Sequence, residues 1–231
     1  MSDGIMVNQM RIGCLHTAHS NIDVFNAAAK ELNLSTAHLT HSTRVDLLAA
    51  AEQAGGLTTQ IISNTMDALL KLCNDNDVVV LTCSTLGSCV EGMPTITATP
   101  VIRVDEALAK RAVSLGKRVT VLCTAATTID PTSNLFLSVA QGKDTKIEIQ
   151  LVLEAWHLFR SGEIDAYLSS IAQAADDAFD AGAEVVAFAQ ASMSGAASLV
   201  KNQQRPLTSP TCGLQAALFA AQTQDSITKK H

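Results

Sequence analysis

The sequence repeats itself at an offset of 107 residues, and this internal repeat limits the folds that are open to the chain. RIGCLHTAHSNID at 11–23 aligns with RVTVLCTAATTID at 118–130, and the two segments share Arg, Leu, Thr, Ala, Ile and Asp. The same offset aligns DVVVLTCST at 77–85 with EVVAFAQAS at 184–192, and Gly55 with Gly162. One offset that serves three segments predicts two similar structural halves.

Each half alternates short β-branched runs with longer alanine-rich segments of helical period, which predicts βα units and a parallel sheet. We expect strands at 10–15, 37–40, 78–82, 118–123, 146–153 and 185–189. We expect helices near 21–33, 44–54, 58–74, 104–115, 131–141, 162–181, 194–203 and 212–223. The predicted fold class is α/β, with two pseudosymmetric halves, each a mainly parallel sheet flanked by helices, and a cleft between them.

Proline-containing segments give the predicted boundaries between the halves. Pro94 and Pro100 mark one crossing, and RPLTSP at 205–210 marks a second. CGLQAALFAAQ has the apolar face of a helix that packs on another surface. We therefore expect a first half of 1–100 plus a returning C-terminal helix in 209–231, and a second half of 101–208.

Charge and cysteine content exclude several classes of partner. The 231 residues carry a formal charge of −6 and no basic cluster larger than Lys229–Lys230, which argues against nucleic acid and anionic membranes as partners. No apolar run reaches the roughly 18 residues of a membrane span. The six cysteines show no CxxC or zinc-type spacing, and no secretory leader is recognisable at the start of the sequence. These features predict a reduced, cytoplasmic protein with a small-molecule ligand, and they leave a homo-oligomer open.

Polar residues follow the predicted strands of both halves, at the edge where open parallel sheets bind ligands. Cys83 comes directly after an apolar strand, and the repeat aligns Gln190 with it. Backbone N–H groups and hydroxyls at such an edge can hold a carboxylate without a metal or cofactor. The predicted catalytic residue is Cys83, and the predicted substrate-binding residues are His16, Thr17, Ser20, Asn21, Ser84, Thr85, Thr124, Thr127, Thr128, Gln190, Ala191 and Ser192.

These features resemble the aspartate/glutamate racemase superfamily, which also contains hydantoin racemases, maleate isomerases and arylmalonate decarboxylases. VLTCST at 80–85 is similar to the strand-end cysteine segment of that superfamily. HLTHSTRVDLL at 38–48 and AWHLFRSGEID at 155–165 also look like segments of racemase-like proteins, so the resemblance covers most of the chain. The resemblance implies a cofactor-independent enzyme that acts at the α-carbon of a small carboxylate such as an amino acid, with Cys83 as acid/base or nucleophile.

The chain departs from that superfamily at Gln190, which stands where a second thiol is expected. A carboxamide does not titrate near neutral pH, so two-thiol racemisation is in doubt. Ser192, His16 and Cys123 are the remaining candidates for a second acid/base. The alternatives are a single-cysteine decarboxylase or cis-trans isomerase, and a non-catalytic protein that binds a small carboxylate. The other histidines considered, His38, His41 and His157, lack the paired spacing of a metal site, so no metal is expected.

Overall fold

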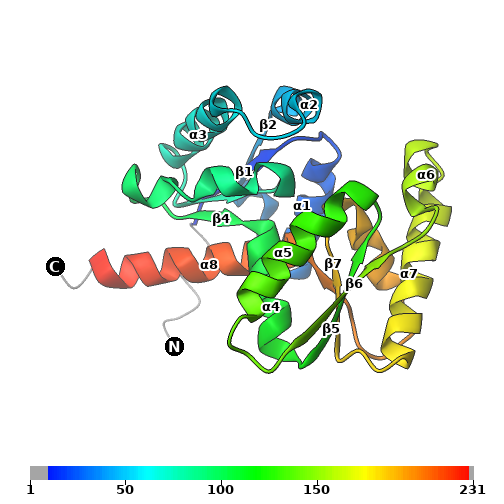
Figure 1. The fold of residues 1–231 in the computed structure, drawn as a ribbon. Coiled ribbons are helices and arrows are strands. Elements are labelled where there is room, and N and C mark those ends of the chain that lie inside the picture. Colours follow the sequence, from blue (N-terminus) through cyan, green and yellow to red (C-terminus); the bar gives the residue numbers. More distant parts are fainter. Residues whose placement is uncertain (1–9, 229–231) are drawn as a thin grey trace. The chain divides into compact units, whose positions relative to one another are not determined.

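The computed structural model describes residues 10–228, which divide into two compact units (Figure 1). Unit 1 comprises the residues up to Val104 and those from Gly213 onward, and unit 2 comprises Asp105–Cys212. Each unit contains one sheet of four strands, and all six strand pairings are parallel. The prediction of an α/β fold with two similar halves, each built on a parallel sheet flanked by helices, is confirmed.

The sheet of unit 1 has the strand order β2-β1-β3-β4. Its strands are β1 (Ile12–His16), β2 (Leu39–Thr43), β3 (Val78–Leu81) and β4 (Val101–Arg103). The connecting helices are α1 (Asn21–Glu31), α2 (Val45–Ala54) and α3 (Thr59–Cys73), with 3-10 segments η2 (Thr36–His38), η3 (Ser84–Val90) and η4 (Met93–Thr95). The C-terminal helix α8 (Ser209–Thr228) contacts this unit, because Gln224 Nε2 donates to the Ala98 carbonyl oxygen at 2.6 Å.

The sheet of unit 2 has the equivalent order β6-β5-β7-β8. Its strands are β5 (Arg118–Cys123), β6 (Lys146–Leu151), β7 (Val185–Phe188) and β8 (Leu207–Thr208). Its helices are α4 (Val104–Leu115), which begins at the last residue of unit 1, α5 (Ile129–Ala140), α6 (Ala155–Arg160) and α7 (Ile164–Asp180), with 3-10 segments η5 (Ala126–Thr128) and η6 (Ala191–Ser198). Strand β7 lies 107 residues after β3 at both ends, so the offset seen in the sequence is the offset between equivalent strands.

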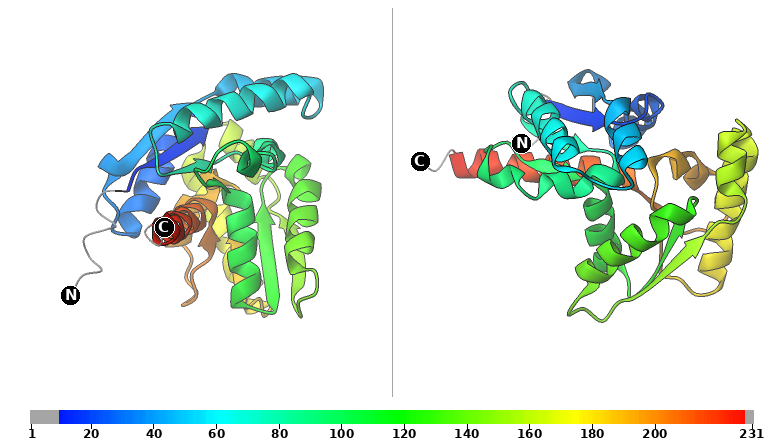
Figure 2. Two further views of the ribbon diagram at one scale, coloured as in Figure 1. Left: turned by 90° about the vertical axis from the view of Figure 1, so that its left-hand side faces the viewer. Right: turned by 45° about the horizontal axis from the view of Figure 1, so that its top comes forward.

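Alternation along the strands decides which helices cover each face of a sheet. In unit 2, Val119 and Val121 pack with α4 and α5, whereas Leu122 packs with α6 and α7 on the other face (Figures 1 and 2). In unit 1, Leu15 packs with α2 and α3. Cys14 and His16 therefore point to the opposite face, where the ring of Phe25 from α1 meets the His16 ring edge-on at 5.3 Å between centroids.

The structure corrects several predicted element boundaries. Strands β4 and β8 were not predicted, because with three and two residues they are too short to show a period. Strand β4 directly follows Pro100, and β8 lies inside RPLTSP, and both of these segments were interpreted as crossings. Segment 194–203 was predicted as an α-helix, but 3-10 geometry is found at 191–198. The predicted strand 37–40 begins with a 3-10 turn and continues to Thr43. Pro131 does not delay α5, because it lies in the first turn, where no helical N–H bond is lost.

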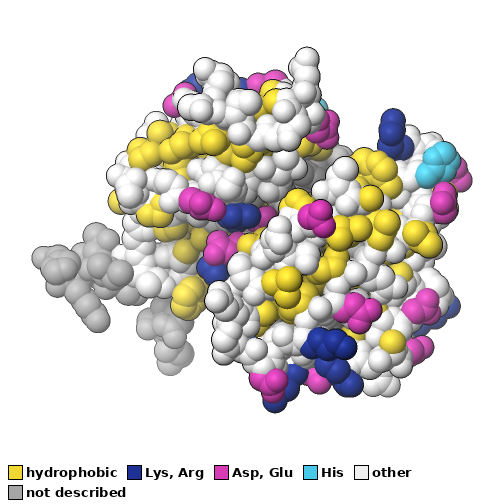
Figure 3. All heavy atoms as spheres, in the orientation of Figure 1, with side chains coloured by type: hydrophobic (Ala, Val, Ile, Leu, Met, Phe, Trp, Pro, Cys, Tyr) yellow, Lys and Arg dark blue, Asp and Glu magenta, His cyan; other side chains and the backbone are white. Residues whose placement is uncertain are grey.

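Exposed apolar side chains accompany the elements around α5 and α6 of unit 2. Leu137, Leu153 and Trp156 are among the large hydrophobic residues left exposed, and hydrophobic side chains are visible over this region in Figure 3.

Among the described residues, no helix combines the length and the apolarity that crossing a bilayer requires.

Candidate active site

In unit 1 the candidate catalytic thiol lies at the carboxyl edge of the sheet. Cys83 is two residues beyond the end of β3, has extended backbone geometry, and is 8% exposed. Ser84 and Thr85, which follow it in η3, are exposed. The end of the neighbouring strand β1 lies beside this segment, because the Thr82 N–H donates to the Leu15 carbonyl oxygen at 3.0 Å. The loop after β1, with Thr17, Ser20 and Asn21, therefore starts next to the segment that carries the thiol.

A cation lies in the same loop region. Arg103, the last residue of β4, packs its guanidinium against Gly87 of η3 so closely that a Cβ atom at position 87 would lie 2.5 Å from the nearer terminal nitrogen. Arg103 also pairs with Glu91 at 3.8 Å. Burial raises the pKa of the Cys89 thiol, which the charge of Arg103 partly offsets. The edge therefore combines a thiol, two exposed hydroxyl residues and a guanidinium, which is a suitable set of groups for a small carboxylate.

Behind this edge, a chain of hydrogen bonds runs through two histidines. His16 Nδ1 lies 2.9 Å from Thr82 Oγ1, and His16 Nε2 lies 2.9 Å from His41 Nδ1. His41 Nε2 lies 3.2 Å from Asn26 Oδ1. Thr82 Oγ1 is also 3.0 Å from the Leu15 carbonyl oxygen. Both ring nitrogens of His16 are thus engaged, and its side chain is 0% exposed, so it contacts the sheet edge through Thr82, the residue before the candidate thiol.

Burial controls the protonation of the groups under α1. It lowers the pKa of His16 to about 4, with a smaller contribution from the charge of His41, and it also lowers the pKa of His41. Burial raises the pKa of the Cys14 thiol to about 12. Sγ of Cys14 and ring nitrogens of both histidines lie within 4.8 Å of one another, so these are the residues of the described chain that could hold a metal ion.

In unit 2 the equivalent edge is built from amides and hydroxyls. Gln190, two residues after β7, accepts a hydrogen bond from the Thr124 N–H at 3.2 Å and a longer one from the Thr124 hydroxyl at 3.4 Å. The Gln190 Nε2 atom donates to Thr128 Oγ1 at 2.7 Å. The amide therefore bridges the loops after β5 and β7. Its oxygen has two donors, and one of its two N–H groups has an acceptor.

A tyrosine that the sequence did not single out lies behind this edge. Tyr167 of α7 is 0% exposed, and its hydroxyl lies 2.8 Å from Ser192 Oγ. Burial raises the pKa of Tyr167, and hydrogen bonds with Ser192 and Thr124 partly offset that shift. In the sequence, Tyr167 has the helical period of a core residue. Only the structure shows that its hydroxyl reaches the strand-end loops.

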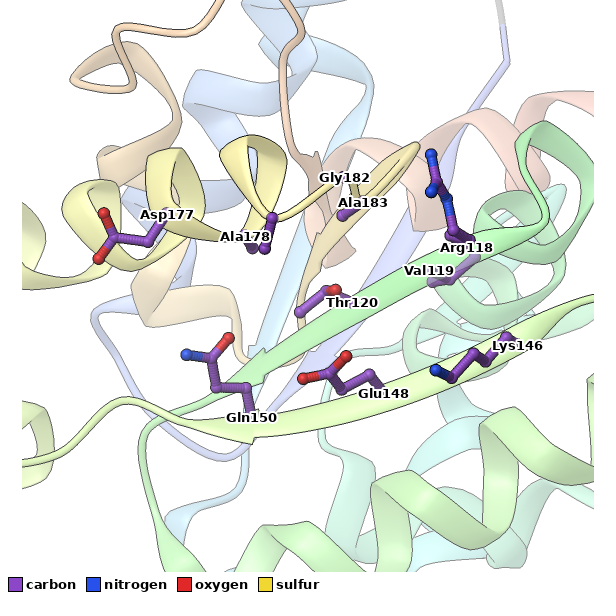
Figure 4. Close-up of a pocket in the computed structure, with 11 residues that line it drawn as sticks. Arg118, Val119, Thr120, Lys146, Glu148, Gln150, Asp177, Ala178, Gly182 and Ala183 are labelled. Atoms are coloured by element: carbon purple, nitrogen blue, oxygen red, sulfur yellow. The ribbon is translucent and has the colours of Figure 1, made fainter.

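A separate pocket of about 250 Å³ lies in unit 2, away from Gln190 (Figure 4). Its walls come from the first residues of β5, from alternate residues along β6, and from the end of α7 with the turn that follows it, and they include Arg118, Lys146, Glu148 and Asp177. The lining residues Lys146, Glu148 and Gln150 alternate along β6, so this pocket lies over one face of the sheet, and Gln190 is not among its lining residues. Its charged residues could transfer protons, but its lining contains none of the predicted site residues, so it is not the candidate site.

The structure brings the predicted residues together in two separate groups. Cys83, Ser84, Thr85 and Thr17 lie at the carboxyl edge of unit 1, and Thr124, Thr128 and Gln190 are joined by hydrogen bonds at the edge of unit 2. Thr127 is exposed and Ser20 makes no side-chain cap to α1. Sequence reasoning missed Thr82, Asn26 and Tyr167, and considered His41 only for metal spacing along the chain.

The repeated parallel sheets define the fold class, an α/β protein of two similar units. The family model "Asp/Glu/Hydantoin racemase" matches residues 19–217. Since that match spans most of the 231 residues, the chain belongs to the Asp/Glu/hydantoin racemase family. No match is found among curated proteins.

Solved racemase structures share the fold. The aspartate racemase of Picrophilus torridus superimposes with a TM-score of 0.64 at 10% identity, covering 92% of this chain and 94% of that one. Allantoin racemase from Pseudomonas fluorescens gives 0.59 at 18% identity, covering 95% and 91%. The glutamate racemase of Francisella tularensis, solved in complex with D-glutamate, gives 0.58 at 11% identity, covering 96% and 82%.

Proposed function

We propose that the protein is a cofactor-independent enzyme that acts at the α-carbon of a small carboxylate such as an amino acid, with Cys83 as acid/base or nucleophile. The observation that carries this proposal is the position of Cys83 at the carboxyl edge of a parallel sheet, directly before Ser84 and Thr85 of η3, the segment that Arg103 contacts at Gly87, in a chain of the racemase family. Ligands of open α/β sheets bind at this edge. Glutamate and aspartate racemases among the structural neighbours support a small carboxylate substrate, and an allantoin racemase among them supports a small substrate more broadly.

The chemistry requires a base close to the α-carbon and donors around the substrate carboxylate. The Cys83 thiolate takes the α-proton and becomes a thiol, and the electron pair of the broken C–H bond moves into the carboxylate to form an enediolate. Hydroxyls of Ser84 and Thr85, backbone N–H groups of the loop and the Arg103 guanidinium supply positive partners for the charge that develops on the oxygens. Return of a proton from this thiol to the same face of the carbon restores the thiolate and the starting enantiomer, so Cys83 alone supports exchange of the α-proton with solvent, whereas inversion needs a second proton donor on the other face.

Gln190 favours chemistry with one thiol. Racemisation by two thiols needs a second group that can give a proton to the other face of the intermediate, and an amide cannot do this. The Gln190 amide is fixed by Thr124 and Thr128, which suits a hydrogen-bonding group rather than an acid or base. This observation favours, as the second candidate, single-thiol decarboxylation or cis-trans isomerisation. A cytoplasmic location and assembly as a homo-oligomer remain predictions that accompany the proposal.

The test is competitive alkylation. Brief treatment with iodoacetamide followed by mass spectrometry is expected to modify Cys83 first, and amino acids, malonates or maleate that bind at the edge are expected to protect it. Cys73 is the internal control, because it is more exposed than Cys83 and would react first if exposure alone set the rate. Preferential labelling of Cys73, or labelling of Cys83 that no small carboxylate slows, would contradict the assignment.

A further inference from the structure

Three potential metal ligands converge on the face of the unit 1 sheet that α1 covers. Cys14 and His16 are two residues apart on β1, so their side chains point to the same face. His41 is the register partner of Cys14 on the parallel strand β2, which places it on that face as well. Sequence spacing alone does not show the group, because the register between β1 and β2 brings together residues that are 27 positions apart in the chain.

The donor atoms are close enough for one ion. The Cys14 Sγ atom and one ring nitrogen from each histidine lie within 4.8 Å of one another, and the facing nitrogens His16 Nε2 and His41 Nδ1 are 2.9 Å apart. A tetrahedral zinc with Zn–S of about 2.3 Å and Zn–N of about 2.0–2.1 Å separates its ligand atoms by about 3.3–3.7 Å. The group therefore needs shifts of about 1 Å or less to enclose the ion. A thiolate with two imidazoles is a ligand set that suits zinc.

The second nitrogen of each histidine already has an oxygen partner. His16 Nδ1 faces Thr82 Oγ1 at 2.9 Å, and His41 Nε2 faces Asn26 Oδ1 at 3.2 Å. Metal-bound histidines commonly donate their other N–H to an oxygen in this way, which fixes the ring and its tautomer.

Thr82 allows the change of tautomer without moving a side chain. Without a metal, the Thr82 hydroxyl can donate to His16 Nδ1, and His16 Nε2–H can donate to His41 Nδ1. With a metal, the hydroxyl turns to the Leu15 carbonyl oxygen 3.0 Å away and accepts from His16 Nδ1–H. The lone pairs of the two facing nitrogens are then both free to bind the ion.

We propose that Cys14, His16 and His41 form a zinc-binding site under α1, with Thr82 and Asn26 as its outer hydrogen-bond partners. His41 is the partly exposed member of the three, and the other two are 0% exposed. A zinc ion at this site would take water as its remaining ligand from the partly exposed side, where His41 lies. The site is separate from the Cys83 thiol, and it is a property of unit 1 alone, because the equivalent positions of unit 2 hold Val121 and Cys123 on β5 and Ile149, the register partner of Val121, on β6.

The test is titration of the chelator-treated full chain with Co²⁺ and then Zn²⁺. We expect one equivalent of Co²⁺ to give a thiolate-to-cobalt charge-transfer band in the near ultraviolet, which Zn²⁺ then removes by displacement. Cys14→Ser is expected to abolish the band. Thr82→Val is expected to lower the affinity for Zn²⁺ about 10- to 100-fold, since His16 then lacks its outer partner.

Two matched variants separate this site from the other thiols. Cys212→Ser removes a thiol that is also buried, in unit 2, and Cys83→Ser removes the candidate catalytic thiol, so both are expected to keep the band. If Cys14→Ser does not fold, His41→Leu serves instead, because its side chain is only partly buried. Absence of the band in the unmodified chain, its persistence in Cys14→Ser or His41→Leu, or its loss in Cys83→Ser would overturn the proposal.

Discussion

Replacing Gln190 by leucine tests whether the second strand-end position is a fixed structural bridge. The change removes hydrogen bonds of 2.7 Å to Thr128 and 3.2 Å from the Thr124 N–H, together with a weak one of 3.4 Å. Each of the two good bonds contributes about 1 kcal/mol net, and the Thr124 N–H, in a residue that is 3% exposed, is left without its acceptor. We therefore expect Gln190→Leu to lower the free energy of unfolding by about 2–3 kcal/mol.

The assay uses the one tryptophan of the chain as a probe of unit 2. Trp156 stacks on Phe159 with ring centroids 5.5 Å apart, and Phe159 lies 5.1 Å from the ring of Tyr167, whose hydroxyl reaches the same edge. Urea unfolding followed by tryptophan fluorescence therefore reports the stability of the unit that carries the change.

Gln173→Leu is the matched control for this experiment. The Gln173 amide donates to Asp177 at 2.8 Å on the exposed face of α7, and such a pair four residues apart contributes only about 0.2–0.5 kcal/mol. A loss in Gln190→Leu no larger than the loss in Gln173→Leu would refute the account, because the amide would then not be held by Thr124 and Thr128.

Three further predictions concern the second acid/base, the cation at the edge and the buried thiols. Gln190→Cys adds a titrating group at the position that the repeat pairs with the candidate catalytic thiol, and it is expected to introduce or raise racemisation, measured by polarimetry; no gain would contradict the single-thiol interpretation. Gly87→Ala would place a Cβ atom 2.5 Å from the Arg103 guanidinium and displace the guanidinium. The concentration of carboxylate that protects the Cys83 thiol from alkylation should then rise roughly tenfold or more. The control is Gly92→Ala, whose added Cβ atom would have its nearest neighbour at 3.5 Å and should leave that concentration unchanged. Burial raises the pKa of the Cys212 thiol from 9.0 to about 12, so the contribution of this thiol to stability is complete below pH 9 and is lost between pH 9 and about 12. Measured by urea unfolding, the free energy of unfolding of Cys212→Ala should fall less over that range than that of the wild-type protein. Equal falls in the two proteins would contradict the shift.

The fold class could be predicted because the strand period and the repeat between the two halves are both visible directly in the sequence. The offset of 107 residues between the segments that carry Cys83 and Gln190 is the offset between β3 and β7 in the structure. The short strands β4 and β8 could not be predicted, since two or three residues carry no period and their pairing is decided by the neighbouring strand.

The site was only partly predictable, because several of its contacts depend on register. His16 was expected beside the ligand, and the structure shows that its ring is buried and hydrogen-bonded to Thr82 and His41. No pattern in the sequence places Cys14 beside His41, because that contact follows from the pairing of β1 with β2. Tyr167 has the period of a core residue, and only the packing of α7 brings its hydroxyl to Ser192.

Exchange of the substrate α-proton in deuterium oxide tests the central claim most directly. Amino acids and related small carboxylates are incubated with the wild-type protein and with Cys83→Ala, and deuterium at the α-carbon is followed by NMR for each enantiomer. With Cys83 as the one titrating group, the wild-type protein should label a single enantiomer, or isomerise or decarboxylate a substrate with one handedness, and Cys83→Ala should be inactive. Rapid exchange in both enantiomers by the wild-type protein, or exchange that survives in Cys83→Ala, would contradict the account.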